Sequence, residues 1–169
     1  MTTKIILSFF AISIYASSTC EDIQKLYITG DYKKCSKQDA VVKTLSPECR
    51  YITALCDIGN YEYDDARYEL SVLSVPDKKA EKISSINALA LNSLTELAFL
   101  KGEYSKARML SVEINSVLSK KLPGSYEYAI SEILLTKSYF DAKDSFSARK
   151  RINMLRSNTD PLFYSCLEP

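Results

Sequence analysis

The sequence predicts an all-α protein, an array of about four antiparallel helical hairpins, and three observations support this prediction. The composition is that of an ordinary globular domain, 46% hydrophobic and 25% charged, with only four glycines and five prolines to form irregular segments. Apolar residues recur at the spacing of helical turns along most of the chain. Single glycines also alternate with single prolines, at Gly30, Pro47, Gly59, Pro76, Gly102 and Pro123.

These glycines and prolines divide the chain into eight expected helices. Glycine suits the left-handed residue that ends a helix, and proline is tolerated in the first turn of the next one. Ser46 before Pro47 and Glu48 has the form of an N-cap, and Asp77 and Asp144 are comparable candidates. The expected helices are Glu21–Thr29, Tyr32–Leu45, Pro47–Ile58, Tyr63–Leu73, Ile83–Lys101, Tyr104–Ser119, Tyr126–Asp141 and Ser145–Arg156.

Residues 1–18 are expected to be an export signal. Lys4 supplies the positive charge, residues 5–15 form an apolar run, and residues 16–18 are small enough for cleavage. The apolar run is too short to span a bilayer as an anchor. Residues 19–157 should then form the helical domain, and residues 158–169 a tail that caps its end. A lipid anchor at Cys20 is an alternative, but Ser-Ser-Thr before it does not resemble the usual lipidation motif.

The charge balance limits the classes of partner. One of the 22 basic residues, Lys4, lies in the expected signal, so 21 basic residues balance 21 acidic ones in the mature chain. A net charge near zero argues against nucleic acid or an anionic membrane as the main partner. The chain has no histidine, the commonest general base and zinc ligand. We therefore expect no catalysis, metal or cofactor. The expected export signal indicates a location in the periplasm or outside the cell.

One stretch carries a family motif. Gly102-Glu103-Tyr104-Ser105-Lys106-Ala107 has glycine, an acid, tyrosine, two free positions and alanine. This stretch resembles the turn of a tetratricopeptide repeat. Leu91, Leu94 and Ala98 occupy positions where that family has the large and small residues of its first helix. The resemblance implies a right-handed solenoid of helical hairpins that binds other proteins.

The other copies of the motif are weaker. Gly30-Asp31-Tyr32-Lys33-Lys34-Cys35 has cysteine in place of alanine. Gly59-Asn60-Tyr61 is followed by Ala66 two residues late, and Lys143-Asp144-Ser145 lacks glycine and tyrosine although Ala148 is in register. The turns are then 29, 43 and 41 residues apart, whereas the family repeats about every 34 residues. The alternative is an unrelated helical bundle with glycine turns.

The resemblance also implies a binding groove, because the first helices of successive repeats line a concave surface that receives a peptide or helix. The alternatives are that the two phenylalanines of this set belong to the core and that Glu96 and Lys137 only pair with each other. The groove residues are expected to be Asn92, Glu96, Phe99, Ile133, Lys137 and Phe140.

By analogy, we expect an accessory or assembly subunit of a bacterial envelope, secretion or pilus complex. The alternative is a secreted effector or inhibitor that acts on a host or competitor protein.

Five cysteines in an exported chain favour disulfides over metal binding. In the expected hairpins, Cys35 and Cys56 lie near the same end of neighbouring helices, which makes them the preferred pair. Cys20 and Cys49 lie at equal height on successive first helices, which allows a second pair if the two side chains face each other. Cys49 and Cys56 would be about 10 Å apart along one helix, too far for a disulfide. Cys166 is left over, either free, paired with Cys20 if the tail returns, or intermolecular.

Two further surface features can be identified in the sequence. Tyr61, Tyr63 and Tyr68 lie beside Asp64-Asp65, either as an exposed anchor for a partner or packed between helices with the hydroxyls at the surface. The run Arg149-Lys150-Arg151 is expected to be a solvated helix face.

Overall fold

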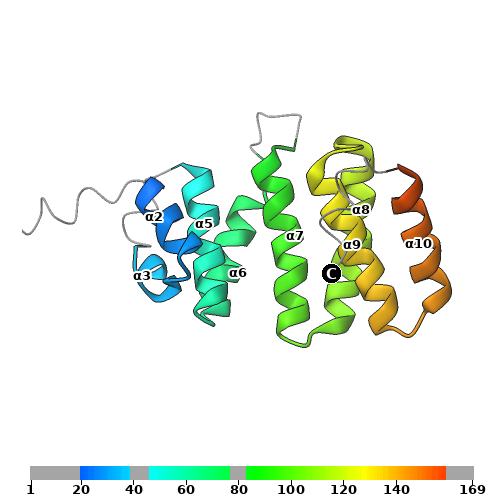
Figure 1. The fold of residues 1–169 in the computed structure, drawn as a ribbon, viewed down its shortest axis with the longest axis horizontal. Helices are drawn as coiled ribbons and strands as arrows, with labels where there is room; N and C mark the ends of the chain where they lie inside the picture. The colour runs from blue at the N-terminus through cyan, green and yellow to red at the C-terminus, as the bar shows by residue number, and fades with distance from the viewer. Residues whose placement is uncertain (1–19, 39–45, 77–82, 159–169) are drawn as a thin grey trace, which may run out of the picture. The chain divides into compact units, whose positions relative to one another are not determined.

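The computed structural model describes residues 20–38, 46–76 and 83–158, which form helices joined by turns, with no strand among them (Figure 1). This confirms the all-helical prediction. The expected signal, Asp77, Cys166 and tail residues 159–169 lie outside the described residues. The helices are α2 (Cys20–Ile28), α3 (Tyr32–Ser36), α5 (Pro47–Gly59), α6 (Tyr63–Leu73), α7 (Ser85–Leu100), α8 (Tyr104–Lys121), α9 (Tyr126–Asp141) and α10 (Ser145–Asn158).

The chain divides into two compact units, one up to Leu70 and one from Ser71. In the first unit, α2, α3 and α5 pack against one another. Helix α3 ends at Ser36, earlier than the expected Leu45, and residues 39–45 lie outside the described part. One core cluster of this unit consists of Ile23, Cys35 and Cys56, with Leu26, Tyr27, Tyr32 and Ile52 packed against it.

Two disulfides connect the helices of the first unit. Cys20 and Cys49 join α2 to α5 with Cα atoms 5.4 Å apart, and Cys35 and Cys56 join α3 to α5 with Cα atoms 5.8 Å apart. Both separations lie in the range that disulfides require. The two predicted pairings are therefore confirmed.

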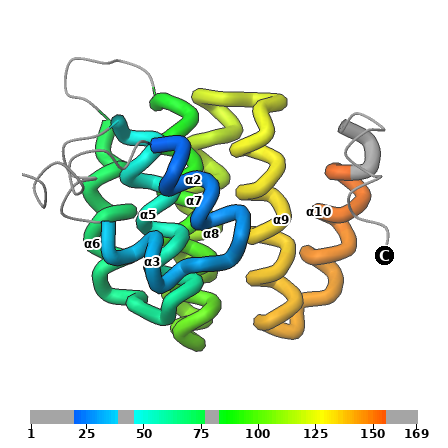
Figure 2. Tube along the Cα trace, turned by 60° about the vertical axis from the view of Figure 1, so that its left-hand side comes forward, coloured from blue at the N-terminus to red at the C-terminus, as the bar shows by residue number. Residues whose placement is uncertain are grey.

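In the second unit, α7, α8, α9 and α10 follow one another as antiparallel neighbours, and α7 also contacts α9 (Figures 1 and 2). Two apolar clusters lie in the described part of this unit. One is formed by Ala88, Ile114 and Leu118, and the other by Ala98, Phe99 and Ala107. Within the described ranges, no helix is both long and apolar enough to span a membrane.

Polar caps start α5 and α10 where the sequence indicated. Pro47 occupies the first turn of α5, and the Ser46 side chain accepts a hydrogen bond from the amide of Cys49. Asp144 Oδ1 accepts one from the amide of Ser147 at 3.1 Å. Hydrogen bonding to the Ser147 side chain, and then to its backbone amide, holds the pKa of Asp144 below its usual value. Both caps confirm the predictions made for these positions.

All four hairpins share one turn geometry. In each, one residue has a positive φ angle: 75° at Gly30, 65° at Tyr61, 72° at Gly102 and 59° at Lys143. The amide of the acidic residue that follows donates to a carbonyl five positions back, at 2.8–2.9 Å. This is the bond of the Schellman motif that ends a helix. Its four donors are Asp31, Glu62, Glu103 and Asp144.

The carbonyl of each acidic residue then accepts a bond from the amide four positions on, at 2.9–3.1 Å. The residue with that amide is small and fully buried in every hairpin. A large side chain there would push the two helices of the hairpin apart. Each of the four hairpins therefore needs a small residue at this position. The four buried residues are Cys35, Ala66, Ala107 and Ala148.

This geometry corrects the alignment of the second turn. Tyr61, not Gly59, is the left-handed residue, so Ala66 is in register with the other copies. Gly59 is the last residue of α5, and a Cβ atom there would lie 2.6 Å from the ring of Tyr32. Gly59 therefore allows the ring of Tyr32 to pack directly against the backbone of α5. The left-handed residues are 31, 41 and 41 positions apart, not the 29, 43 and 41 expected.

Candidate functional site

The predicted groove residues lie on α7 and α9, which contact each other in the second unit. Glu96, Lys137 and Phe140 are exposed, and the ring of Phe140 keeps half of its surface accessible. Ile133 is partly buried. These residues present a carboxylate, an ammonium group and apolar surface on the outside of the unit.

Two predicted groove residues are inside the unit instead. Asn92 is 3% exposed, and its amide nitrogen donates to the backbone carbonyl of Glu127 at 2.8 Å. Phe99 is 5% exposed, and Lys137 Nζ lies 4.6 Å from the centre of its ring. This cation–π contact positions the ammonium group of Lys137. The alternative that Lys137 only pairs with Glu96 does not describe this lysine, which lies over the ring. Asn92 and Phe99 therefore lie beneath the exposed residues and are not themselves accessible to a partner.

The amino-terminal ends of α7 and α9 are also joined. The hydroxyl of Ser85 donates to the carboxylate of Glu127, and the Ser125 side chain caps α9 by accepting from the amide of Tyr128 at 3.1 Å. Burial acts to raise the pKa of Glu127, but the hydrogen bonds to Ser85, its own backbone and Ser125 outweigh burial and lower that pKa. This ionised carboxylate fixes one end of the surface.

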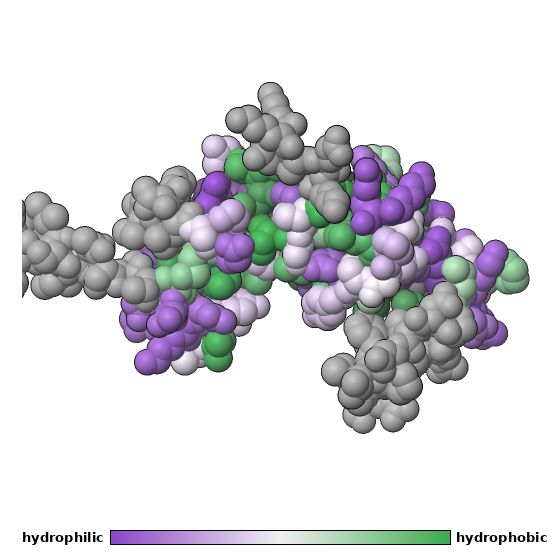
Figure 3. All heavy atoms as spheres, turned by 90° about the horizontal axis from the view of Figure 1, so that it is seen from above, coloured by the Kyte–Doolittle hydropathy of each residue, from purple (hydrophilic) through white to green (hydrophobic). Residues whose placement is uncertain are grey.

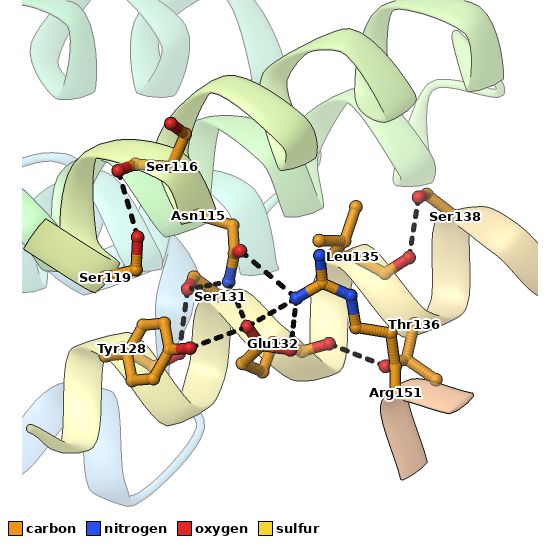
Figure 4. A network of polar contacts seen from close by, with 10 residues as sticks. All are labelled: Asn115, Ser116, Ser119, Tyr128, Ser131, Glu132, Leu135, Thr136, Ser138 and Arg151. Atoms are coloured by element: carbon orange, nitrogen blue, oxygen red, sulfur yellow. Dashed lines mark hydrogen bonds and ion pairs between the residues drawn. The ribbon is translucent and has the colours of Figure 1, made fainter. Parts of the chain in front are cut away.

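A buried polar network joins α8, α9 and α10 around the carboxylate of Glu132 (Figure 4). Arg151 Nη1 donates to both carboxylate oxygens, at 2.7 and 2.9 Å. The side-chain amide of Asn115 donates to Glu132 at 2.7 Å and to Ser131 at 3.0 Å, and the hydroxyl of Tyr128 donates to Glu132 at 2.9 Å. Every neighbour of this carboxylate is thus a donor, as a buried charge requires.

This network was not predicted. Arg151 was expected on a solvated face, but its guanidinium group points at Glu132 from a partly buried position. Burial, and then the hydrogen bond to Glu132, raise the pKa of the Tyr128 hydroxyl, so it stays protonated and remains a donor. Because these hydrogen bonds join three successive helices, α8, α9 and α10, we interpret the network as structural.

The first unit contains a second buried ion pair. Arg50 Nε on α5 lies 2.5 Å from Glu69 Oε1 on α6, and Glu69 is 4% exposed. Arg50 is eleven residues before the left-handed Tyr61, and Glu69 is eight after it. Counted from Lys143, Glu132 and Arg151 occupy the same two positions. The two pairs are thus equivalent, with their charges exchanged, and only the corrected register of the turns makes this visible in the sequence.

The tyrosines that follow α5 are accessible. Tyr61 is 79% and Tyr68 is 65% exposed, and the Tyr61 and Tyr63 rings make an edge contact with centres 6.1 Å apart. Packing between helices therefore does not describe Tyr61 or Tyr68. Asp64 and Asp65 beside them are exposed too.

No protein-family model, curated protein or solved structure matches the chain. In the part of the chain that the structure describes, no group of three or more histidine, cysteine, aspartate or glutamate side chains is placed to hold a metal ion.

Proposed function

We propose that this protein is an exported, non-catalytic protein-interaction module with tetratricopeptide-like hairpins. The observation that supports this most is the fourfold turn, in which a left-handed residue, an acidic residue and a buried small residue recur in the same hydrogen-bonding pattern. Repetition of a hairpin favours a repeat protein over an unrelated bundle, and repeat proteins generally present extended binding surfaces.

The partner is a peptide or helix that lies along α7 and α9. Lys137, held over the ring of Phe99, would receive an acidic group of the partner, and Glu96 a basic one. Phe140 and Ile133 would supply the apolar contact. Such a surface selects its partner by charge and by one or two apolar anchors.

The proposed location is the periplasm or the outside of the cell. Two disulfides fit an oxidising compartment, in agreement with the expected export signal. In that compartment we propose the role of an accessory or assembly subunit of an envelope, secretion or pilus complex. A secreted effector or inhibitor would use the same surface. Recovery from culture medium favours the effector, and recovery from the periplasmic fraction favours the subunit.

A crosslinked pull-down from envelope fractions tests the surface itself. The variants are Phe140→Ala and Glu96→Lys, whose side chains are exposed, so folding should be preserved. Phe99→Ala is unsuitable because it would open a cavity in the core. Met109→Ala is the matched control, since Met109 is 69% exposed on α8. We expect the first two variants to lose the partner and the control to keep it; equal recovery with all three would contradict the proposal.

A further inference from the structure

The outward side of α10 carries a second candidate surface, away from α7. Residues at helical spacing on one side of α10 line a shallow, open depression. Phe146 is 79% and Met154 is 42% exposed, although both are large apolar residues. We call this surface the α10 face and define it by Phe146, Arg149, Lys150, Asn153 and Met154.

The α10 face is basic as well as apolar. Helix α10 contains four basic residues and no acidic one. Arg151 is neutralised by Glu132, whereas Arg149 and Lys150 are exposed on the α10 face. At the right-hand end of Figure 3, where α10 lies, hydrophilic and apolar residues are interspersed on the surface. A partner that fits must bring acidic groups together with apolar or aromatic side chains.

The chain itself contains a surface of that kind. Tyr61, Asp64, Asp65 and Tyr68 are exposed at the start of α6, and we call them the α6 patch. Residues 46–73, which form α5 and α6, contain six acidic and two basic residues. The charge of this hairpin is therefore opposite to that of α10.

We propose that the α10 face of one molecule binds the α6 patch of a second copy. Asp64 and Asp65 would pair with Arg149 and Lys150, and the cations would also lie against tyrosine rings, which attract them. Phe146 and Met154 would pack on the same rings, because methionine sulfur and aromatic rings make favourable contacts. This proposal does not depend on the groove of α7 and α9, since it uses neither helix.

The contact should be weak and salt-dependent. One helix face against one patch buries less than the roughly 1,200 Å² that stable complexes need, so association should appear only at high protein concentration. Exposed charges contribute most of the attraction, and salt screens them.

Sedimentation velocity of the oxidised protein, from micromolar to millimolar concentration at low and high salt, tests this proposal. We expect the wild-type average mass to rise with concentration at low salt and much less at high salt. R149E/K150E and D64K/D65K should each raise the dissociation constant at least about tenfold. An equimolar mixture of the two variants should associate again, because each then offers a surface complementary to the other.

K120E/K121E is the matched control, since it changes the net charge as R149E/K150E does but at exposed residues of α8. It should associate like the wild type. Circular dichroism confirms that each variant is folded. A wild-type protein that stays monomeric throughout overturns the proposal and leaves the α10 face to another acidic molecule or to none. Failure of the mixture to associate, or equal loss in the control, also overturns it.

Discussion

The hairpins α5–α6 and α9–α10 contain the same buried ion pair with its charges exchanged. Arg50 on α5 meets Glu69 on α6, whereas Glu132 on α9 meets Arg151 on α10. In the hairpin α7–α8 the equivalent positions hold Leu91 and Leu110, which pack against one apolar cluster. These two equivalent positions therefore require side chains that complement each other. The pair can be charged or apolar, and either helix can carry the acidic residue.

The two hairpins differ in how they hold their neighbours. Helix α5 is joined to α2 and α3 by disulfides at Cys49 and Cys56. Helix α9 is joined to α8 by hydrogen bonds from Asn115 to Glu132 and Ser131. The Glu132 carboxylate therefore also connects α9 to the preceding helix. In the first unit, disulfides make the corresponding connections from α5.

The largest effect should come from Glu132→Ala. This change leaves the Arg151 charge, the Asn115 amide and the Tyr128 hydroxyl without their shared acceptor. We expect the free energy of unfolding to fall by about 3–5 kcal/mol, as for other buried pairs that lose one partner. Denaturant unfolding and amide exchange in α8, α9 and α10 measure it. Glu113→Ala, at an exposed position of α8, is the control; a similar small loss in both would mean that the network is not structural.

Removal of Cys35 and Cys56 should have the next largest effect, confined to the first unit. Their disulfide spans 21 residues, and opening a loop of that size costs about 3 kcal/mol. Hydrogen exchange of C35S/C56S should show lost protection in residues 20–38 and 46–70, with α8 to α10 unchanged. Equal loss of protection in α9 would contradict the assignment of separate neighbours to the two hairpins.

Gly59→Ala should destabilise by about 1–3 kcal/mol, because the new methyl group would overlap the Tyr32 ring. Gly30→Ala is the comparison, since nothing lies within 4 Å there and the cost of about 1 kcal/mol comes from the left-handed backbone alone. Thermal unfolding separates the two explanations when each change is combined with Tyr32→Leu. The smaller ring-free side chain should rescue Gly59→Ala only, and rescue of neither would be evidence against the close approach.

The smallest effect should be a gain. Lys143 has a left-handed backbone without being glycine, so Lys143→Gly should relieve strain and stabilise by about 0.5–1 kcal/mol after the entropy cost of glycine. Thermal unfolding checks this. A loss of stability would mean that the fourth turn does not behave like the turn at Gly102.

The sequence was sufficient for most of the helices, because caps and turn residues act locally, and the expected hairpins then gave the disulfides. The main exception is α3, which ends at Ser36 and not at Leu45. Caps such as Ser46 and the heights of Cys35 and Cys56 along their helices need no knowledge of packing. The turn at Tyr61 was misplaced because glycine has two uses, the left-handed turn and close approach, and Gly59 serves the second. Composition alone could not distinguish these uses.

The candidate site was predicted in part. The family resemblance placed the six residues on the helices that are α7 and α9, but the depth of a residue within a helical unit depends on what packs alongside it. Phe99 is buried and Phe140 is half exposed, although both lie three residues before the left-handed residue of a turn. Glu132 was missed because a buried carboxylate looks like a surface residue until its donors on neighbouring helices are known.

The equivalence of the hairpins is tested most directly by exchanging the charges of the first pair, with Arg50→Glu and Glu69→Arg made singly and together. Each single change should lose about 3 kcal/mol or more, because two like charges then meet in a buried position. The double variant has the order found in α9–α10, and its free energy of unfolding should return to within about 1 kcal/mol of the wild type. A double variant as unstable as the sum of its single changes would contradict the account.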